Sequence, residues 1–167
     1  MTAELPARIS ALVDPRACFT QLQRRTGPDW RRDVIRVVRH PQGIGVDPAP
    51  LLREASLDRL RESLAPVARR GAEDLLKLIL SGSLFHGLDA QLIESDLVLA
   101  RSIQEVLDSF GPGVEYFTNH GHAEDGEEAQ FLVTGFHFNS LAVTLYDICL
   151  IAVDSDRILV AWRFEDA

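Results

Sequence analysis

Residues 142–164 read AVTLYDICLIAVDSDRILVAWRF and predict two β-strands joined by a turn. The segments on either side of Asp154-Ser155-Asp156 are rich in β-branched and aromatic residues, and DSD is typical of a hairpin turn. Large apolar side chains alternate along the second segment, while Arg157 and Arg163 lie on its other face. We therefore expect the last strand to have one buried face and one polar outer face.

Two upstream segments, VEYFT (114–118) and FLVTGFHF (131–138), have a similar composition and predict two more strands. Turn-forming residues separate the predicted strands, and the connections are short. Antiparallel pairing is expected, because parallel neighbours need a crossover of about a dozen residues or more.

The first two thirds of the chain carry mainly helix signals. Asp14-Pro15 predicts the start of a helix that Gly27 would stop. Ser56 predicts the start of another helix, which Pro66 would bend or divide. Apolar residues at helical spacing predict two further helices over 72–80 and 89–110, the second with Ser95 as an alternative start.

One segment in this helical part, DVIRVVRH (33–40), is short and β-branched and predicts a strand. Helices followed by strands define an α+β fold, here a helical layer over about 1–112 packed on a C-terminal antiparallel sheet of about four strands over about 113–167. The length of 167 residues and the 46% hydrophobic content favour one domain over 1–167.

The two cysteines, Cys18 and Cys149, lie far apart in the sequence without a CxxC or Cys/His spacing. A disulfide framework and a zinc finger are therefore disfavoured, and a reducing compartment is expected. The chain has no apolar run of membrane-spanning length, and MTAELPARIS lacks the pattern of a signal peptide. We expect a soluble, cytoplasmic protein.

Charge is distributed unevenly around a net value of −8. Residues 1–70 carry 13 Arg and 8 acidic residues, a net +5, whereas 71–167 carry 4 basic and 17 acidic residues, a net −13. Such an acidic region repels nucleic acid and anionic membrane and favours a basic protein partner. The alternative is that the two halves neutralise each other across the surface.

The densest group of reactive side chains lies in NHGHAEDGEE (119–128). His120 and His122 alternate at a strand end, so both imidazoles can face one way, and His137 on the next predicted strand is a candidate third metal ligand. An H-x-H with nearby acids specifies neither a metal nor a reaction. The alternative is an ordinary solvated acidic hairpin tip.

Asp147 interrupts an apolar strand, where a carboxylate is costly unless it is paired. It is expected either to pair with Arg157 or Arg163 or to be a catalytic carboxylate with a raised pKa. Cys149 shares its strand without a neighbouring His, and Cys18 is expected on a short amphipathic helix. Both thiols are predicted to be inert.

Sequence signatures of common enzyme classes are absent, since the chain has no phosphate-binding glycine loop, GxSxG, HExxH or DxDxDG. Paired arginines around Trp30 resemble a nucleic-acid patch, but Asp29 and Asp33 interrupt them and the whole chain is acidic. We interpret them as an ordinary charged surface. The arginines are Arg24, Arg25, Arg31, Arg32, Arg36 and Arg39.

Three classes of function follow. The first is a non-enzymatic protein-binding module without a cofactor, such as a stoichiometric inhibitor or immunity-type protein that neutralises a basic nuclease or toxin. The second is a small metal-dependent hydrolase or transferase using His120, His122, Asp147 and one of the nearby carboxylates Glu124, Asp125, Glu127 or Glu128. The third is an oligomeric scaffold presenting C-terminal aromatic residues. The partner-facing residues predicted for the first class are Glu124, Asp125, Glu127, Glu128, Asp154, Asp156, Glu165 and Asp166.

Overall fold

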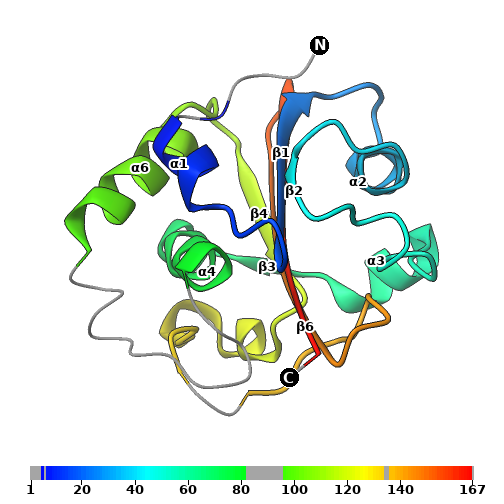
Figure 1. The fold of residues 1–167 in the computed structure, drawn as a ribbon. Helices are drawn as coiled ribbons and strands as arrows, with labels where there is room; N and C mark the ends of the chain where they lie inside the picture. The colour runs from blue at the N-terminus through cyan, green and yellow to red at the C-terminus, as the bar shows by residue number, and fades with distance from the viewer. Residues whose placement is uncertain (1–4, 6, 82–95, 134–135, 167) are drawn as a thin grey trace.

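A computed structural model of the chain describes residues 5, 7–81, 96–133 and 136–166 (Figure 1). Their strands form one six-stranded antiparallel sheet in the order β2-β1-β6-β5-β4-β3. The strands are β1 Cys18–Arg24, β2 Ile44–Gly45, β3 Ala65–Val67, β4 Glu115–Thr118, β5 Tyr146–Val153 and β6 Arg157–Glu165. The α+β class is confirmed, and so is antiparallel pairing.

Helices cover both faces of the sheet, which Figure 1 shows edge-on. On one side lie α1, α4 and α6, together with the 3₁₀ helix η1, and on the other side lie α2 and α3 (Figure 1). The helices are α1 Ala7–Leu12, α2 Trp30–Arg39, α3 Leu57–Ser63, α4 Arg69–Ser81, α6 Leu97–Asp108 and η1 Gly121–Glu128. The predicted division into a helical N-terminal part and a β C-terminal part is therefore wrong, because strands and helices alternate along the chain.

The hairpin of β5 and β6 is at the centre of the sheet and is buried on both faces. Leu159 and Ala161 pack in the core beneath α4 and α6, whereas Val160 and Trp162 pack in the core beneath α2 and α3. The expected polar outer face is wrong for this reason. Even Arg163 is only 8% exposed, and its guanidinium donates to the Ile79 carbonyl at 2.9 Å.

The predicted helix between Asp14 and Gly27 is a strand, β1. Seven of its residues pair with β6, and every side chain from Cys18 to Leu22 is buried. Strand pairing with a segment more than a hundred residues away thus overrides the local helix signals. The placement of Cys18 on an amphipathic helix is wrong as well.

The predicted strand over 33–40 is the body of helix α2. Asp29 caps the helix by accepting a hydrogen bond from the Arg31 N–H, and the apolar residues Val34, Val37 and Val38 recur at helical spacing on its buried face. Amphipathic burial against the sheet therefore outweighs the strand preference of β-branched residues.

Ser56 does cap α3, as predicted, but the helix ends at Ser63 instead of bending at Pro66. Pro66 lies in β3 at the edge of the sheet, a position that tolerates a residue without an N–H. The predicted strand 131–138 contributes only an isolated bridge between His120 and Phe138 in its described part.

Helix α4 agrees with the prediction over 72–80, and α6 forms the second half of the helix predicted over 89–110. Asp96 caps α6 by accepting from the Leu99 N–H at 2.9 Å. The predicted first half and the alternative cap Ser95 lie outside the described residues.

Candidate functional site

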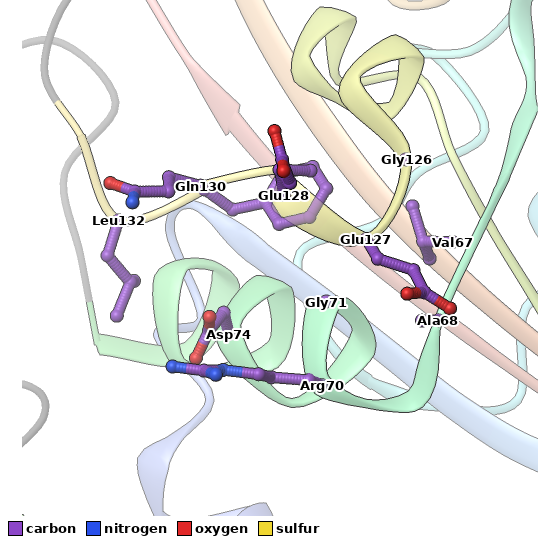
Figure 2. Close-up of a pocket in the computed structure, with 12 residues that line it drawn as sticks. Val67, Ala68, Arg70, Gly71, Asp74, Gly126, Glu127, Glu128, Gln130 and Leu132 are labelled. Carbon is purple, nitrogen blue, oxygen red and sulfur yellow. The ribbon is translucent and has the colours of Figure 1, made fainter.

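The candidate site is a groove of about 770 Å³ between the start of α4 and the segment that follows the kink in η1 (Figure 2). Residues 67–74 line one side and residues 126–132 line the other. Its charged or amide-bearing lining residues are Arg70, Asp74, Glu127, Glu128 and Gln130. We call it the acidic groove.

Two glycines allow the groove to have this shape. Gly126 has φ 64° and ψ −134°, a conformation that only glycine adopts readily, and it turns the chain at the groove edge. At Gly71 a Cβ atom would lie 2.9 Å from a ring carbon of Phe131, so the missing side chain lets that ring pack against α4. Phe131 is 1% exposed and fastens the 126–132 segment to the core.

The acidic residues of η1 are free for external contacts. Glu124, Asp125, Glu127 and Glu128 are exposed, and no ion pair to any of them is found in the described part of the chain. Across the groove, Asp74 lies 3.8 Å from the Lys77 ammonium. Figure 2 shows the Glu127 and Glu128 side chains on the η1 side of the groove, opposite α4.

His120, His122 and His137 do come together, with their rings in edge-on contact within an aromatic cluster. The ring centroids of His120 and His122 are 4.9 Å apart, and those of His122 and His137 are 5.9 Å apart. His120 also stacks on Phe136 at 4.5 Å and meets Phe131 edge-on. Within residues 5, 7–81, 96–133 and 136–166, no three His, Cys, Asp or Glu side chains are grouped so that they could hold a metal ion.

His120 is a buried, neutral residue that organises η1. Its Nδ1 accepts a hydrogen bond from the His122 N–H at 3.0 Å, and its buried Nε2 has no partner among the described residues. Burial, together with the neighbouring His122 and His137, lowers the pKa of His120 to about 3. The ring therefore stays uncharged at neutral pH and serves as the N-terminal cap of η1.

Asp147 is fully buried on the other side of the sheet, where Trp162 packs. Its carboxylate accepts hydrogen bonds from Trp162 Nε1 at 3.1 Å, Asn119 Nδ2 at 2.9 Å and the N–H groups of Leu141 and Ala142 at 3.1 Å. Burial raises the pKa of Asp147, and these donors oppose the rise.

The predicted ion pair of Asp147 is wrong, because neutral donors satisfy the carboxylate. Arg163 instead lies 2.9 Å from Glu165, and the Arg157 guanidinium contacts the Ser109 carbonyl and the Phe110 ring. The Asp147 carboxylate and the His120 ring belong to opposite faces of the sheet. The structure therefore does not assemble them into one site.

Of the four predicted partner-facing acids near the C-terminus, Asp154 is buried, Glu165 is half-buried, and Asp156 and Asp166 are exposed. Asp154 is only 7% exposed, so the expectation that it is a surface group is wrong. Burial disfavours its charge, but hydrogen bonds from the N–H groups of Gly111, Arg157 and Asp156 hold its pKa below the ordinary value. Asp156 lies 3.8 Å from Arg24, and Glu165 pairs with Arg163. The Asp166 carboxylate accepts a hydrogen bond from the Leu145 N–H.

The cysteines and the C-terminal aromatic residues belong to the core. Cys18 and Cys149 are free and buried, and burial raises the pKa of both thiols. Trp162 and Phe164 are at most 4% exposed. Of the aromatic residues that motivated the scaffold class, Phe131, Trp162 and Phe164 are buried, whereas Phe136 and Phe138 are partly exposed.

Comparison with known proteins gives no match: no family model, no curated protein and no solved structure is significantly similar to the chain. Among the described residues, no helix combines the length and the apolar character that crossing a membrane requires.

Proposed function

We propose that this protein is a non-enzymatic binding module that recognises a basic protein partner through the acidic groove and η1. The observation that carries the proposal is the set of four exposed carboxylates on η1, of which Glu127 and Glu128 line a groove of about 770 Å³. A stoichiometric inhibitor or immunity-type protein of a basic, nucleic-acid-acting enzyme is the class that fits such a surface best. We place its action in the cytoplasm, which its two free cysteines favour.

The chemistry of the groove suits an arginine or lysine side chain of the partner. A cation entering between Glu127, Glu128 and Asp74 meets carboxylates from two segments, and Arg70 is the one cationic side chain among the described lining residues. Carboxylates gathered on one surface also steer a cationic protein during diffusional encounter. Because η1 is capped by His120 and fastened by Phe131, these carboxylates need little rearrangement before binding.

The hydrolase alternative receives less support from the geometry. It relies on His120, His122, Asp147 and a carboxylate of residues 124–128, and His120 and Asp147 lie on opposite faces of the sheet. Among the described residues, no three of such side chains are grouped so that they could hold a metal ion. The carboxylates of η1 are instead accessible to a macromolecule. Protein binding is therefore the function we propose.

The test is affinity purification of the tagged protein from its native cells at low salt, with three versions compared. The groove variant is Asp125→Asn/Glu127→Gln/Glu128→Gln. Its matched control, Glu62→Gln/Glu105→Gln/Glu115→Gln, removes the same amount of charge from exposed residues elsewhere.

We expect the wild type and the control to retain one basic protein at a one-to-one ratio, and a salt wash to release it. The groove variant should bind that protein on the order of tenfold more weakly. Each exposed carboxylate contributes only modestly to the binding free energy, but the contributions of the three add up. Retention of no basic protein, or equal affinity of the groove variant and the wild type, would contradict the proposal.

A further inference from the structure

We propose a second binding site, for a small ligand bearing two or more phosphate charges, in a groove between α2 and α3. This arginine groove has a volume of about 640 Å³, a size typical of small-molecule sites. The helices α2 and α3 that form it lie on the face of the sheet opposite to α4, which forms one wall of the acidic groove (Figure 1). The inference goes beyond the proposed function, since it uses different residues and a ligand of opposite charge.

The arginines of the groove come from two helices. Arg32, Arg36 and Arg39 recur along one side of α2, and Arg61 joins them from the last turn of α3. Ile35 and Leu57 supply apolar lining between them, and His40 and Asp58 are also in the lining. Four guanidinium groups thus line the groove together with the Asp58 carboxylate, and Asp29 and Asp33 contact the arginines from beside it.

The internal partners of these arginines leave donors available. Arg36 lies 3.7 Å from Asp33 and donates to the Thr26 hydroxyl, and Arg39 donates to the Ala55 carbonyl at 3.4 Å. Arg61 approaches Asp29 at 3.6 Å and Asp58 at 3.5 Å, and Arg32 approaches Asp29 at 3.9 Å. Charge-assisted hydrogen bonds are usually about 2.7–2.9 Å long, so these contacts orient the guanidinium groups without saturating them. The side chains of Arg32 and Arg61 are 68% and 52% exposed, and a guanidinium has about five N–H donors.

Phosphate groups match this arrangement in geometry and in charge. The planar fork of a guanidinium donates two parallel hydrogen bonds to a phosphate, and several forks converging on one groove suit a ligand with several anionic oxygens. Mutual repulsion among the four guanidinium groups also decreases most when the ligand is at least a dianion.

A small phosphate ligand fits better than a nucleic acid. The whole chain carries a net charge of −8, which opposes a long polyanion. The Trp30 ring is already stacked on Phe117 at 4.5 Å, and the Arg31 guanidinium lies 4.4 Å from its centroid. The aromatic residue nearest to the arginines in sequence is therefore occupied within the fold and is not free to stack on a base.

The experiment measures binding of inorganic pyrophosphate and tripolyphosphate to the full chain by calorimetry at low ionic strength. The arginine-groove variant is Arg32→Gln/Arg61→Gln. It is chosen because these two side chains are exposed and their removal leaves the core intact. The matched control is Arg53→Gln/Arg101→Gln, which removes two exposed arginines outside the groove. Melting midpoints establish that both variants are folded, and backbone NMR shifts of the wild type locate the site independently of any variant.

We expect the wild type to bind both probes, with shifts concentrated at residues 32–40 and 56–61. The arginine-groove variant should bind pyrophosphate at least tenfold more weakly than the wild type, whereas the affinity of the control should stay within about twofold of the wild-type affinity. Absence of wild-type binding at millimolar probe, equal losses in the two variants, or shifts located elsewhere would each overturn the proposal. Tighter binding of an oligonucleotide than of tripolyphosphate would overturn the assignment to a small ligand.

Discussion

Acidification should destabilise the fold through His120, and the substitution His120→Phe should remove that part of the pH dependence. The imidazole is 1% exposed, and burial lowers its pKa from 6.5 to about 3. In the unfolded chain the same group takes up a proton at a pH near 6.5. Between these two pH values the unfolded state binds one more proton than the native state, so stability decreases as the pH falls.

The size of the effect follows from the two pKa values. Each pKa unit corresponds to about 1.4 kcal/mol, and the full difference between 6.5 and about 3 amounts to roughly 4–5 kcal/mol. Between pH 7 and pH 4.5, the linkage relation predicts that His120 alone lowers the free energy of unfolding by about 2.5 kcal/mol. The contribution of His120 to stability is fully present above pH 6.5 and is lost as the pH falls towards 3.

Urea unfolding of the wild type and of His120→Phe at pH 7 and pH 4.5 measures this directly. Carboxylates titrate in both proteins and cancel in the comparison, so the difference between the two pH-dependent losses isolates His120. Phenylalanine is compatible with the ring contacts to Phe131 and Phe136, and any packing cost is the same at both pH values. If both proteins lose the same free energy to within about 0.5 kcal/mol, the argument that His120 is buried and neutral fails.

Three further outcomes are expected. Asp147→Asn should lower the free energy of unfolding by about 2–4 kcal/mol in urea, because an amide cannot accept from all the donors that surround the carboxylate; a loss below about 0.5 kcal/mol would contradict this. Gly45→Ala should cost about 1–3 kcal/mol in thermal unfolding, since φ is +112° and a Cβ atom would collide with the Cys18 carbonyl; an unchanged melting midpoint would count against that account. Cys18 and Cys149 should react with a thiol reagent only at the rate of unfolding, and immediate labelling of the native protein would disprove their burial.

The elements that sequence reasoning identified are those whose signals are local. The β5–β6 hairpin is visible because apolar and β-branched residues fill both segments around the turn at 154–156. The cap at Ser56 and the apolar period of α4 are likewise contained within a few residues of the element that they define. In these elements the local sequence preference and the tertiary packing favour the same secondary structure, so the prediction from sequence agrees with the fold.

The errors arose where distant partners decide the structure. β1 follows Asp14-Pro15, which favours a helix, yet its pairing with β6 makes it a strand. The polar outer face expected for β6 is covered by a helical layer, so residues on both faces became core. Neither the partner strand nor the covering helices can be derived from the residues of the strand itself.

The candidate sites show the same limit. The exposed acids at 124–128 were predicted, but the opposite wall of the groove, with Arg70 and Asp74, lies more than fifty residues earlier in the chain. In the sequence, Asp29 and Asp33 interrupt the arginines of α2, a pattern that indicates an ordinary charged surface. On the helix, Asp33 turns inward, is 1% exposed and lies 3.7 Å from the Arg36 guanidinium. Arg61 joins the groove from α3, a neighbour that the sequence of α2 does not reveal.

The two grooves are arranged so that each can act without the other. The buried sheet separates them, and with a helical layer on each side their separation is roughly 20 Å, since layers pack at about 10 Å spacing. That distance is about twice the Debye length at physiological ionic strength, which is about 8 Å. A phosphate ligand in the arginine groove therefore leaves the field at η1 almost unchanged. Any strong coupling between the two sites would have to travel through a rearrangement of the central β5–β6 hairpin, whose residues are packed on both faces and have little space in which to move.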